Sequence, residues 1–171
     1  MKFESQLYFP NQDRVNISKS QKYFYGGCIL LILFCLLAII NQDIWKNDTL
    51  DIILKTCCFI SLGFFAYGKF SSIKSKEKLN GTLNGKIKIS SEYIEIDDNK
   101  YEINKLENLE IRIKDYSGKY RNPGIHYVGP WYMAGINNKL KFKFRNQIIE
   151  KRFKINSENE FELLKKMKAV L

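Results

Sequence analysis

The residue types that carry catalysis and metal binding are sparse in this chain. His126 is the only histidine among the 171 residues, and Glu107 and Glu110, three residues apart, are a candidate carboxylate pair for acid–base work. All four cysteines lie in two apolar runs: Cys28, Cys35, Cys57 and Cys58. Catalytic pairs and metal sites need several such side chains in one place. The sequence therefore predicts no catalytic residues, no metal site, no cofactor, and a protein that is not an enzyme.

One irregular segment, residues 115–138, gathers charged and aromatic side chains. Loops longer than about 12–15 residues are usually functional or disordered, and aromatic residues argue against disorder. Six residues of this segment could form a surface for a ligand or a partner protein: Lys119, Tyr120, Arg121, His126, Trp131 and Tyr132. The alternative is that residues 128–133 form a further strand whose aromatics pack in a core. The sequence leaves both interpretations open.

Two apolar runs, about 23–40 and 50–68, determine where the rest of the chain lies relative to a membrane. A helix of about 17–25 mostly apolar residues is needed to cross a bilayer, and both runs reach that range. The first lacks the polar stripe that a buried helix of a soluble protein keeps. The charge of Lys55 is explained by pairing with Asp51 one helical turn earlier. Residues 23–68 are therefore predicted to be a transmembrane helical hairpin.

The basic residues that flank the hairpin predict its orientation. Lys19 and Lys22 precede the first run, and a basic juxtamembrane linker, 69–82, follows the second. Lysine and arginine in short flanking segments mark the cytoplasmic side. We expect an integral protein of the inner (cytoplasmic) membrane, with the N-terminal segment, residues 1–22, and the C-terminus both in the cytoplasm.

Four lysines of the linker are expected at the membrane surface: Lys69, Lys74, Lys76 and Lys78. Lysines beside a membrane are attracted to anionic lipid, and the net charge of +10 lies almost entirely from Lys69 onward. Setting the topology would explain these lysines equally well. The general basic surplus is explained either by selection or by the composition of the gene.

From Lys86 onward, apolar and polar residues alternate with a period of two. The clearest runs are 86–90, 92–96, 100–103, 109–114, 140–145 and 150–155. Such alternation is typical of strands with one face in a core and the other in water. Turn-forming residues such as 97–99 separate the runs. We predict an antiparallel meander or open barrel of short strands.

The end of the chain changes to a helical period. Ser157 and Glu160 fit a capping box, and Phe161, Leu164 and Met167 form one apolar stripe. A single amphipathic helix is therefore expected to close the sheet. The predicted fold class is a membrane α-hairpin followed by an α+β domain at residues 83–171.

This plan resembles the small bacterial membrane proteins that carry a pleckstrin-homology (PH)-like domain after a two-helix hairpin. The resemblance rests on four stretches: GKIKISSEYIEID, KYEINKLENLEIRIKDY, INNKLKFKFRNQIIEKRFKI and SENEFELLKKM. It implies an open antiparallel sheet with one C-terminal helix, and an interaction or lipid-proximal role. The chain departs from the basic signature of phosphoinositide-binding members, since Ser90, Ser91 and Glu92 follow Lys86 and Lys88.

The leading hypothesis is a non-enzymatic, membrane-anchored binding or scaffold module that engages a protein partner or the anionic inner leaflet from the cytoplasm. A protective membrane protein, for immunity or envelope stress, is the alternative. A membrane-tethered nucleic-acid binder is a second alternative, because residues 142–145 interleave aromatic and basic side chains. Strand alternation explains that interleaving without nucleic acid. We therefore expect membrane lipids and a protein as partners, and no nucleic acid.

Overall fold

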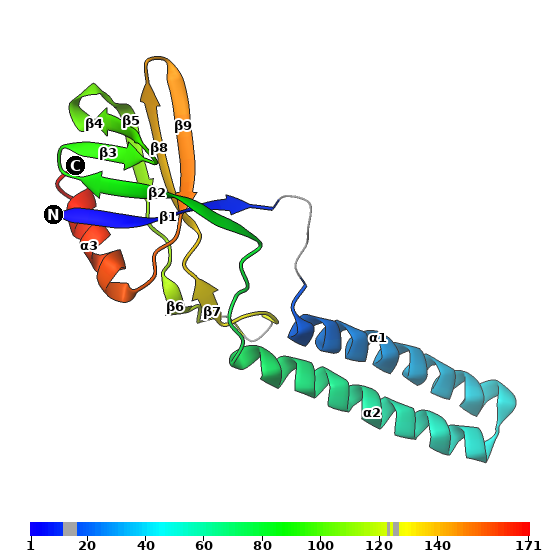
Figure 1. The fold of residues 1–171 in the computed structure, drawn as a ribbon. Coiled ribbons are helices and arrows are strands. Elements are labelled where there is room, and N and C mark those ends of the chain that lie inside the picture. Colours follow the sequence, from blue (N-terminus) through cyan, green and yellow to red (C-terminus); the bar gives the residue numbers. More distant parts are fainter. Residues whose placement is uncertain (12–16, 123, 125–126) are drawn as a thin grey trace. The chain divides into compact units, whose positions relative to one another are not determined.

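The computed structural model describes residues 1–11, 17–122, 124 and 127–171, which form two compact units (Figure 1). The first unit, here called the head, comprises Met1–Val15, Lys76–Arg121 and Tyr132–Leu171. The second, the helical unit, comprises Asn16–Ser75 and Asn122–Trp131. Each unit is therefore assembled from segments that are distant in sequence, and the chain passes between the two units four times.

The helical unit is built on two long helices, α1 at Lys19–Ile40 and α2 at Asp48–Ile73. Ser18 caps α1 with a full capping box, and the Asn47 side chain accepts a hydrogen bond from the Leu50 N–H at the start of α2. A short π-helical turn at Asn41–Trp45 joins them. At 1.5 Å per residue the helices are about 33 and 39 Å long, which exceeds the roughly 30 Å hydrocarbon core of a bilayer.

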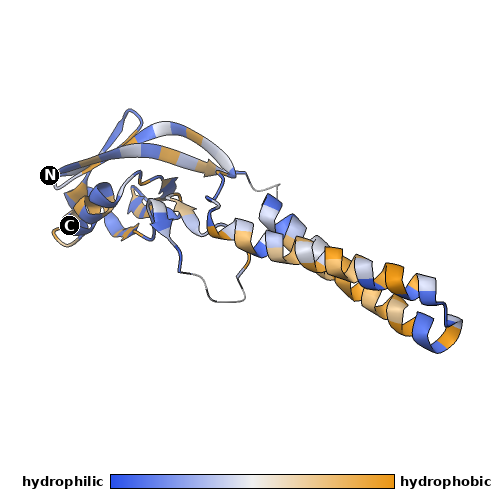
Figure 2. Cartoon of the chain, turned by 90° about the horizontal axis from the view of Figure 1, so that it is seen from below, coloured by the Kyte–Doolittle hydropathy of each residue, from blue (hydrophilic) through white to orange (hydrophobic). Residues whose placement is uncertain are grey.

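Most side chains of these two helices are not covered by other parts of the protein. Only 6% and 11% of the residues in their most apolar windows are buried, and Figure 2 shows apolar residues along both helices. Large apolar side chains such as Ile29 (66% exposed) and Phe59 (79% exposed) form the kind of exposed apolar surface that marks contact with a membrane or another protein. The predicted pair of helices that are long and apolar enough to cross a membrane is confirmed.

Small residues allow the two helices to approach closely. A Cβ atom on Gly27 would lie 2.5 Å from the Phe65 nitrogen, and a Cβ on Gly68 would overlap the backbone of Phe24. Ser61 is also buried, and its hydroxyl donates to the carbonyl of Cys57 within α2. Close backbone approach at small residues is the usual basis of helix association in lipid, where apolar burial provides no driving force.

The head contains one seven-stranded antiparallel sheet with the order β4-β3-β2-β1-β9-β8-β5. Its strands are β1 (Lys2–Pro10), β2 (Gly81–Ser90), β3 (Tyr93–Ile96), β4 (Asn99–Glu102), β5 (Glu107–Arg112), β8 (Asn138–Phe144) and β9 (Gln147–Phe153). A 3₁₀ turn, Ile103–Lys105, connects the edge strand β4 to the opposite edge strand β5. The sheet is not a closed barrel. The short hairpin of β6 (Ser117–Tyr120) and β7 (Tyr132–Ala134) is separate from it.

The inner faces of these strands and the C-terminal helix α3 (Glu158–Lys168) share one hydrophobic core. Alternate residues of each strand enter it, as in Leu140 and Phe142 of β8, and α3 contributes the predicted stripe of Phe161, Leu164 and Met167. The Ser157 hydroxyl accepts from the Glu160 N–H, as predicted. The Glu160 carboxylate, however, accepts from the Asn156 N–H instead of completing the expected capping box at Ser157.

The N-terminal segment contributes a strand that the sequence analysis did not include in the domain. The sequence predicts residues 1–22 as a separate cytoplasmic segment and places the whole domain at residues 83–171, after the hairpin. In the structure, β1 lies between β2 and β9 near the centre of the sheet. Its Phe3 and Leu7 are almost completely buried. A bulge between Gln6 and Tyr8 breaks its alternation.

The whole helical hairpin is consequently inserted between two paired strands. Pro10 at the end of β1 lies opposite Gly81 at the start of β2, and the Asn11 N–H donates to the Asn80 carbonyl at 2.9 Å. A Cβ on Gly81 would overlap the carbonyl of Phe9, so the close pairing at this exit requires glycine. The two connections to the hairpin therefore leave the head at neighbouring points.

Candidate interaction surface

The start of the head after α2 is held in a strand-like pairing. Lys76 forms a parallel β-bridge with Tyr132 of β7, and the Glu77 N–H donates to the Tyr132 carbonyl at 2.8 Å. These contacts hold the backbone at Lys76 and Glu77. Residues 76–78 are here called the docked segment. The sequence analysis treated this part of the chain as a linker, and a charge run gives no sign of such a pairing.

The carboxylate of Glu77 strengthens this attachment. One oxygen lies 3.5 Å from the Arg121 guanidinium, and the other accepts from the Ala134 N–H at 3.1 Å. Both side chains of the ion pair are about one-quarter exposed, so solvent screens the pair only in part. Glu77 thereby connects the docked segment to Ala134 of β7 and to Arg121, the residue directly after β6.

Lys76 and Lys78 flank Glu77 and are exposed. No carboxylate of the described part of the chain lies within ion-pair distance of either amine. The only acidic residue between them is already bonded to Arg121 and Ala134. The docked segment therefore presents two positive charges that no carboxylate among the described residues neutralises.

The other two lysines predicted at the membrane surface belong to the helical unit. The Lys69 amine donates to the Tyr127 carbonyl at 2.7 Å, and Gln21 of α1 donates to the neighbouring Val128 carbonyl at 2.9 Å. Lys69 thus helps to hold residues 127–131 within the helical unit. Lys74, directly after α2, is exposed. A role of these lysines in lipid contact stays a prediction.

The six residues predicted as a binding surface do not all share one face. Tyr120 and Tyr132 lie opposite each other on β6 and β7, with ring centres 5.9 Å apart. Lys119 lies on the other side of β6, where its amine is 5.1 Å from the centre of the Phe161 ring. Arg121 faces Glu77. Trp131 belongs to the helical unit, and its backbone N–H donates to the Ser75 carbonyl.

Of the predicted set, Tyr120, Arg121 and Tyr132 therefore belong with the docked segment. His126 lies outside the described residues. The alternative prediction, a strand over residues 128–133, agrees with the structure only at its end, since β7 covers Tyr132–Ala134.

A buried polar network fixes both ends of the irregular segment. Asp115 and Asn138 are fully buried, and the Asn138 side chain donates to the Asp115 carbonyl at 2.9 Å. The Asn138 oxygen accepts from the Lys114 and Asp115 N–H groups, while the Asp115 carboxylate accepts from the backbone and side chain of Asn137. This network, which sequence reasoning missed, closes the base of the loop and leaves its residues free to form β6 and β7.

The outer faces of the sheet carry their charges in pairs. Lys143 is bonded to Glu107 at 2.8 Å and Lys139 to Glu150 at 2.6 Å. Phe142 is 1% exposed and belongs to the core. A base-stacking platform needs its aromatic and basic side chains together on an exposed face, so residues 142–145 do not form one. The exclusion of nucleic acid stays a prediction.

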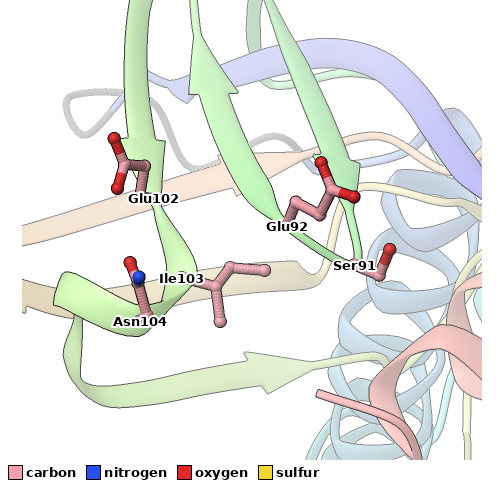
Figure 3. A pocket seen from close by; sticks show the side chains of 5 residues that line it. All are labelled: Ser91, Glu92, Glu102, Ile103 and Asn104. Carbon is pink, nitrogen blue, oxygen red and sulfur yellow. The ribbon is translucent and has the colours of Figure 1, made fainter.

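A polar groove of about 460 Å³ lies at one end of the head, lined by Ser91, Glu92, Glu102, Ile103 and Asn104 (Figure 3). The Ile103 N–H donates to the Glu92 carbonyl and joins its two walls. Lys105, 2.9 Å from Glu102, lowers the pKa of that carboxyl. General acid catalysis needs a carboxyl whose pKa is raised. The groove is better explained as solvated acidic surface.

No three His, Cys, Asp or Glu side chains of the described residues come together as a metal-binding group. Comparison with protein-family models, with curated proteins and with solved structures finds no match for this chain. Within the part of the chain that the structure describes, the docked segment with its two exposed lysines is the feature that most resembles a binding surface.

Proposed function

We propose that this protein is a membrane-anchored, non-enzymatic binding module whose PH-like head works at the cytoplasmic face of the membrane. One observation carries the proposal: two helices of membrane-spanning length are inserted between β1 and β2, which pair with each other inside the head. A folded sheet cannot be divided by a bilayer. The insertion supports a two-span topology in which both chain ends lie on one side.

The distribution of charge supports the cytoplasm as that side. Lys19, Lys22, Lys69 and Lys74 lie near the start of α1 and the end of α2. The connection between the helices and the first turn of α2 carry Asp43, Asp48 and Asp51 with Lys46. An excess of lysine on short flanking segments is retained on the cytoplasmic side during insertion. The PH-like assignment is supported by the seven-stranded antiparallel sheet and by the single amphipathic helix that packs on its core.

The head offers a binding surface rather than a reaction centre. Its exposed lysines on the docked segment suit an anionic membrane surface, and the adjacent Tyr120 and Tyr132 suit contact with a protein. We therefore keep both partners of the proposed module, the anionic inner leaflet and a protein that reaches the same face of the membrane.

The topology is tested with the full-length protein in bacterial membranes. Alkaline phosphatase, which is active only outside the cytoplasm, and green fluorescent protein, which fluoresces inside it, are each fused before Met1 and after Leu171. We expect fluorescence without phosphatase activity at both ends, and retention of the protein in membranes washed with carbonate. Phosphatase activity at either end, or release by carbonate, would refute the proposal.

A further inference from the structure

We propose that Lys76 and Lys78 form a binding site for the phosphate groups of anionic membrane lipids, and that Glu77 is the residue that positions this site. The inference rests on the proposed function, because it places the head beside a bilayer. It assigns the lipid contact to two lysines and one carboxylate of the docked segment instead of to the general basic surplus.

The covalent chain keeps both lysines close to the membrane whatever angle the two units adopt. Helix α2 ends at Ile73, and an extended chain advances at most about 3.3–3.6 Å per residue. The Cα of Lys76 therefore lies within about 11 Å of the Cα of Ile73, and that of Lys78 within about 18 Å. The headgroup layer adds roughly 5–8 Å on each side of the hydrocarbon core, so lipid phosphates lie near the start of the docked segment.

The pairing with β7 orders the backbone at Lys76 and Glu77, and this order sets the direction in which the side chains of the docked segment point. In a strand-like backbone, residues i and i+2 point to the same side, and residue i+1 points to the other. Glu77 turns inward to Arg121 and Ala134, so Lys76 and Lys78 both point outward. Their Cα atoms are then about 6–7 Å apart. A site whose backbone is already ordered loses less conformational entropy when it binds.

The partners of Glu77 also keep its negative charge away from the amines of Lys76 and Lys78. A free carboxylate between two lysines would pair with them and repel a phosphate. Here the Arg121 guanidinium and the Ala134 N–H hold that carboxylate on the inner side. The docked segment keeps its two lysine charges outward, and no described carboxylate is within ion-pair distance of them.

The test measures the reactivity of individual lysine amines in the full-length protein. The protein is placed in nanodiscs of phosphatidylcholine, with or without phosphatidylglycerol, and brief acetylation is read by mass spectrometry. A lysine near an anionic surface gains about 1 kcal/mol, so we expect phosphatidylglycerol to slow the acetylation of Lys76 and Lys78 about five-fold. Lys165 and Lys166 of α3 serve as controls for a general attraction between the basic protein and the anionic lipid, and their acetylation rates should change much less. Equal slowing at all four lysines, or no slowing at Lys76 and Lys78, would overturn the inference.

Glu77→Ala separates positioning from general attraction, because the two predict opposite signs. The variant gains one positive charge, so general attraction predicts more protection of Lys76 and Lys78, whereas our inference predicts that the five-fold protection is lost. Glu92→Ala makes the same charge change at an exposed site and should keep the protection. Lys88 and Lys139 are ion-paired in the folded head, so unchanged reactivity at these amines verifies folding.

Glu77→Gln is the second variant, in case Glu77→Ala unfolds the head. Its amide oxygen can still accept from the Ala134 N–H, so we expect about half of the protection to remain. Protection that is kept or increased in both folded variants contradicts the inference. That result would leave the proposed function standing if the fusions at Met1 and Leu171 both report the cytoplasm, whereas a failed topology test would remove the basis of both proposals.

Discussion

Lys88 and Glu95 lie directly opposite each other on β2 and β3, and the Lys88 ammonium donates a hydrogen bond to the Glu95 carboxylate. The same outer face places Glu4 opposite Lys88 and Lys100 opposite Glu95. Opposite charges thus alternate across four strands, an arrangement that stabilises cross-strand pairing. The hydrogen bond from Lys88 is the main cause that lowers the pKa of Glu95 below its ordinary value of 4.5.

This relationship predicts how the stability of the head depends on pH. Because the folded-state pKa of Glu95 is below the unfolded value, its contribution is complete well above pH 4.5 and is lost as pH falls through the folded value. Glu95→Gln should therefore reduce the loss of stability on acidification. Urea unfolding of the detergent-solubilised protein near neutral pH and near pH 3, followed by circular dichroism, measures this difference. Glu92→Gln is the control, and an equal effect in both variants would contradict the assignment.

The contact between α1 and α2 predicts a sharp difference between glycines. Gly27→Ala and Gly68→Ala should each destabilise the hairpin by about 1–3 kcal/mol, because the added methyl group overlaps the backbone of the facing helix. Gly26 and Gly63 have open space around the same position, so their alanine variants should be almost neutral. Unfolding by sodium dodecyl sulfate in mixed micelles gives the four free energies. Similar losses at all four glycines would show that the helices do not pack through Gly27 and Gly68.

The central position of β1 predicts that a residue near the N-terminus is essential to a domain that is mostly C-terminal. Leu7 is 0% exposed, and Leu7→Ala should lower the free energy of unfolding of the head by about 2–5 kcal/mol. Gln6, its neighbour on the outer face, is exposed, so Gln6→Ala should have little effect. Chemical unfolding monitored by circular dichroism tests both. An undiminished stability of Leu7→Ala would remove β1 from the core.

The buried network at the base of the irregular segment predicts a larger loss at Asn138 than at Asn137. Asn138→Ala leaves the Lys114 and Asp115 N–H groups without their acceptor, and each unsatisfied buried group costs about 1–3 kcal/mol. Asn137→Ala removes one side-chain donor but keeps the backbone hydrogen bond to Asp115, so its cost should be about 1 kcal/mol. Thermal unfolding ranks the two variants, and the opposite order would refute this account.

The elements that sequence alone predicted are those whose pattern is local. The long apolar runs, of which the second is broken by Lys55, predicted the two helices. The period of two predicted strands such as β8 and β9, because both patterns reflect the immediate environment of each residue. The stripe of Phe161, Leu164 and Met167 likewise predicted α3. The ends of α1 and α2 extend beyond the predicted spans, since polar residues can continue a helix after it leaves the apolar region.

The features that were missed depend on contacts between distant residues. The strand β1 is short and bulged, and its partner β2 begins after the entire hairpin, so its register is set by pairing that no local pattern records. The role of Glu77 depends on Arg121 and Ala134, which are far from it in sequence. Within its own surroundings, Glu77 was only one acidic residue in a run of lysines. The predicted surface was divided because neighbouring residues on β6, such as Lys119 and Tyr120, face opposite sides.

The insertion of the hairpin between β1 and β2 has a consequence for biosynthesis. The ribosome completes β1 first, and roughly 70 residues, including both spans, must follow before β2 begins. At about 5–20 residues per second, β1 waits some 4–14 seconds for its first partner. In the proposed topology, the N-terminal strand stays in the cytoplasm, unpaired, until both helices have been synthesised and inserted. Completion of the head is then coupled in time to insertion of the helical hairpin into the bilayer.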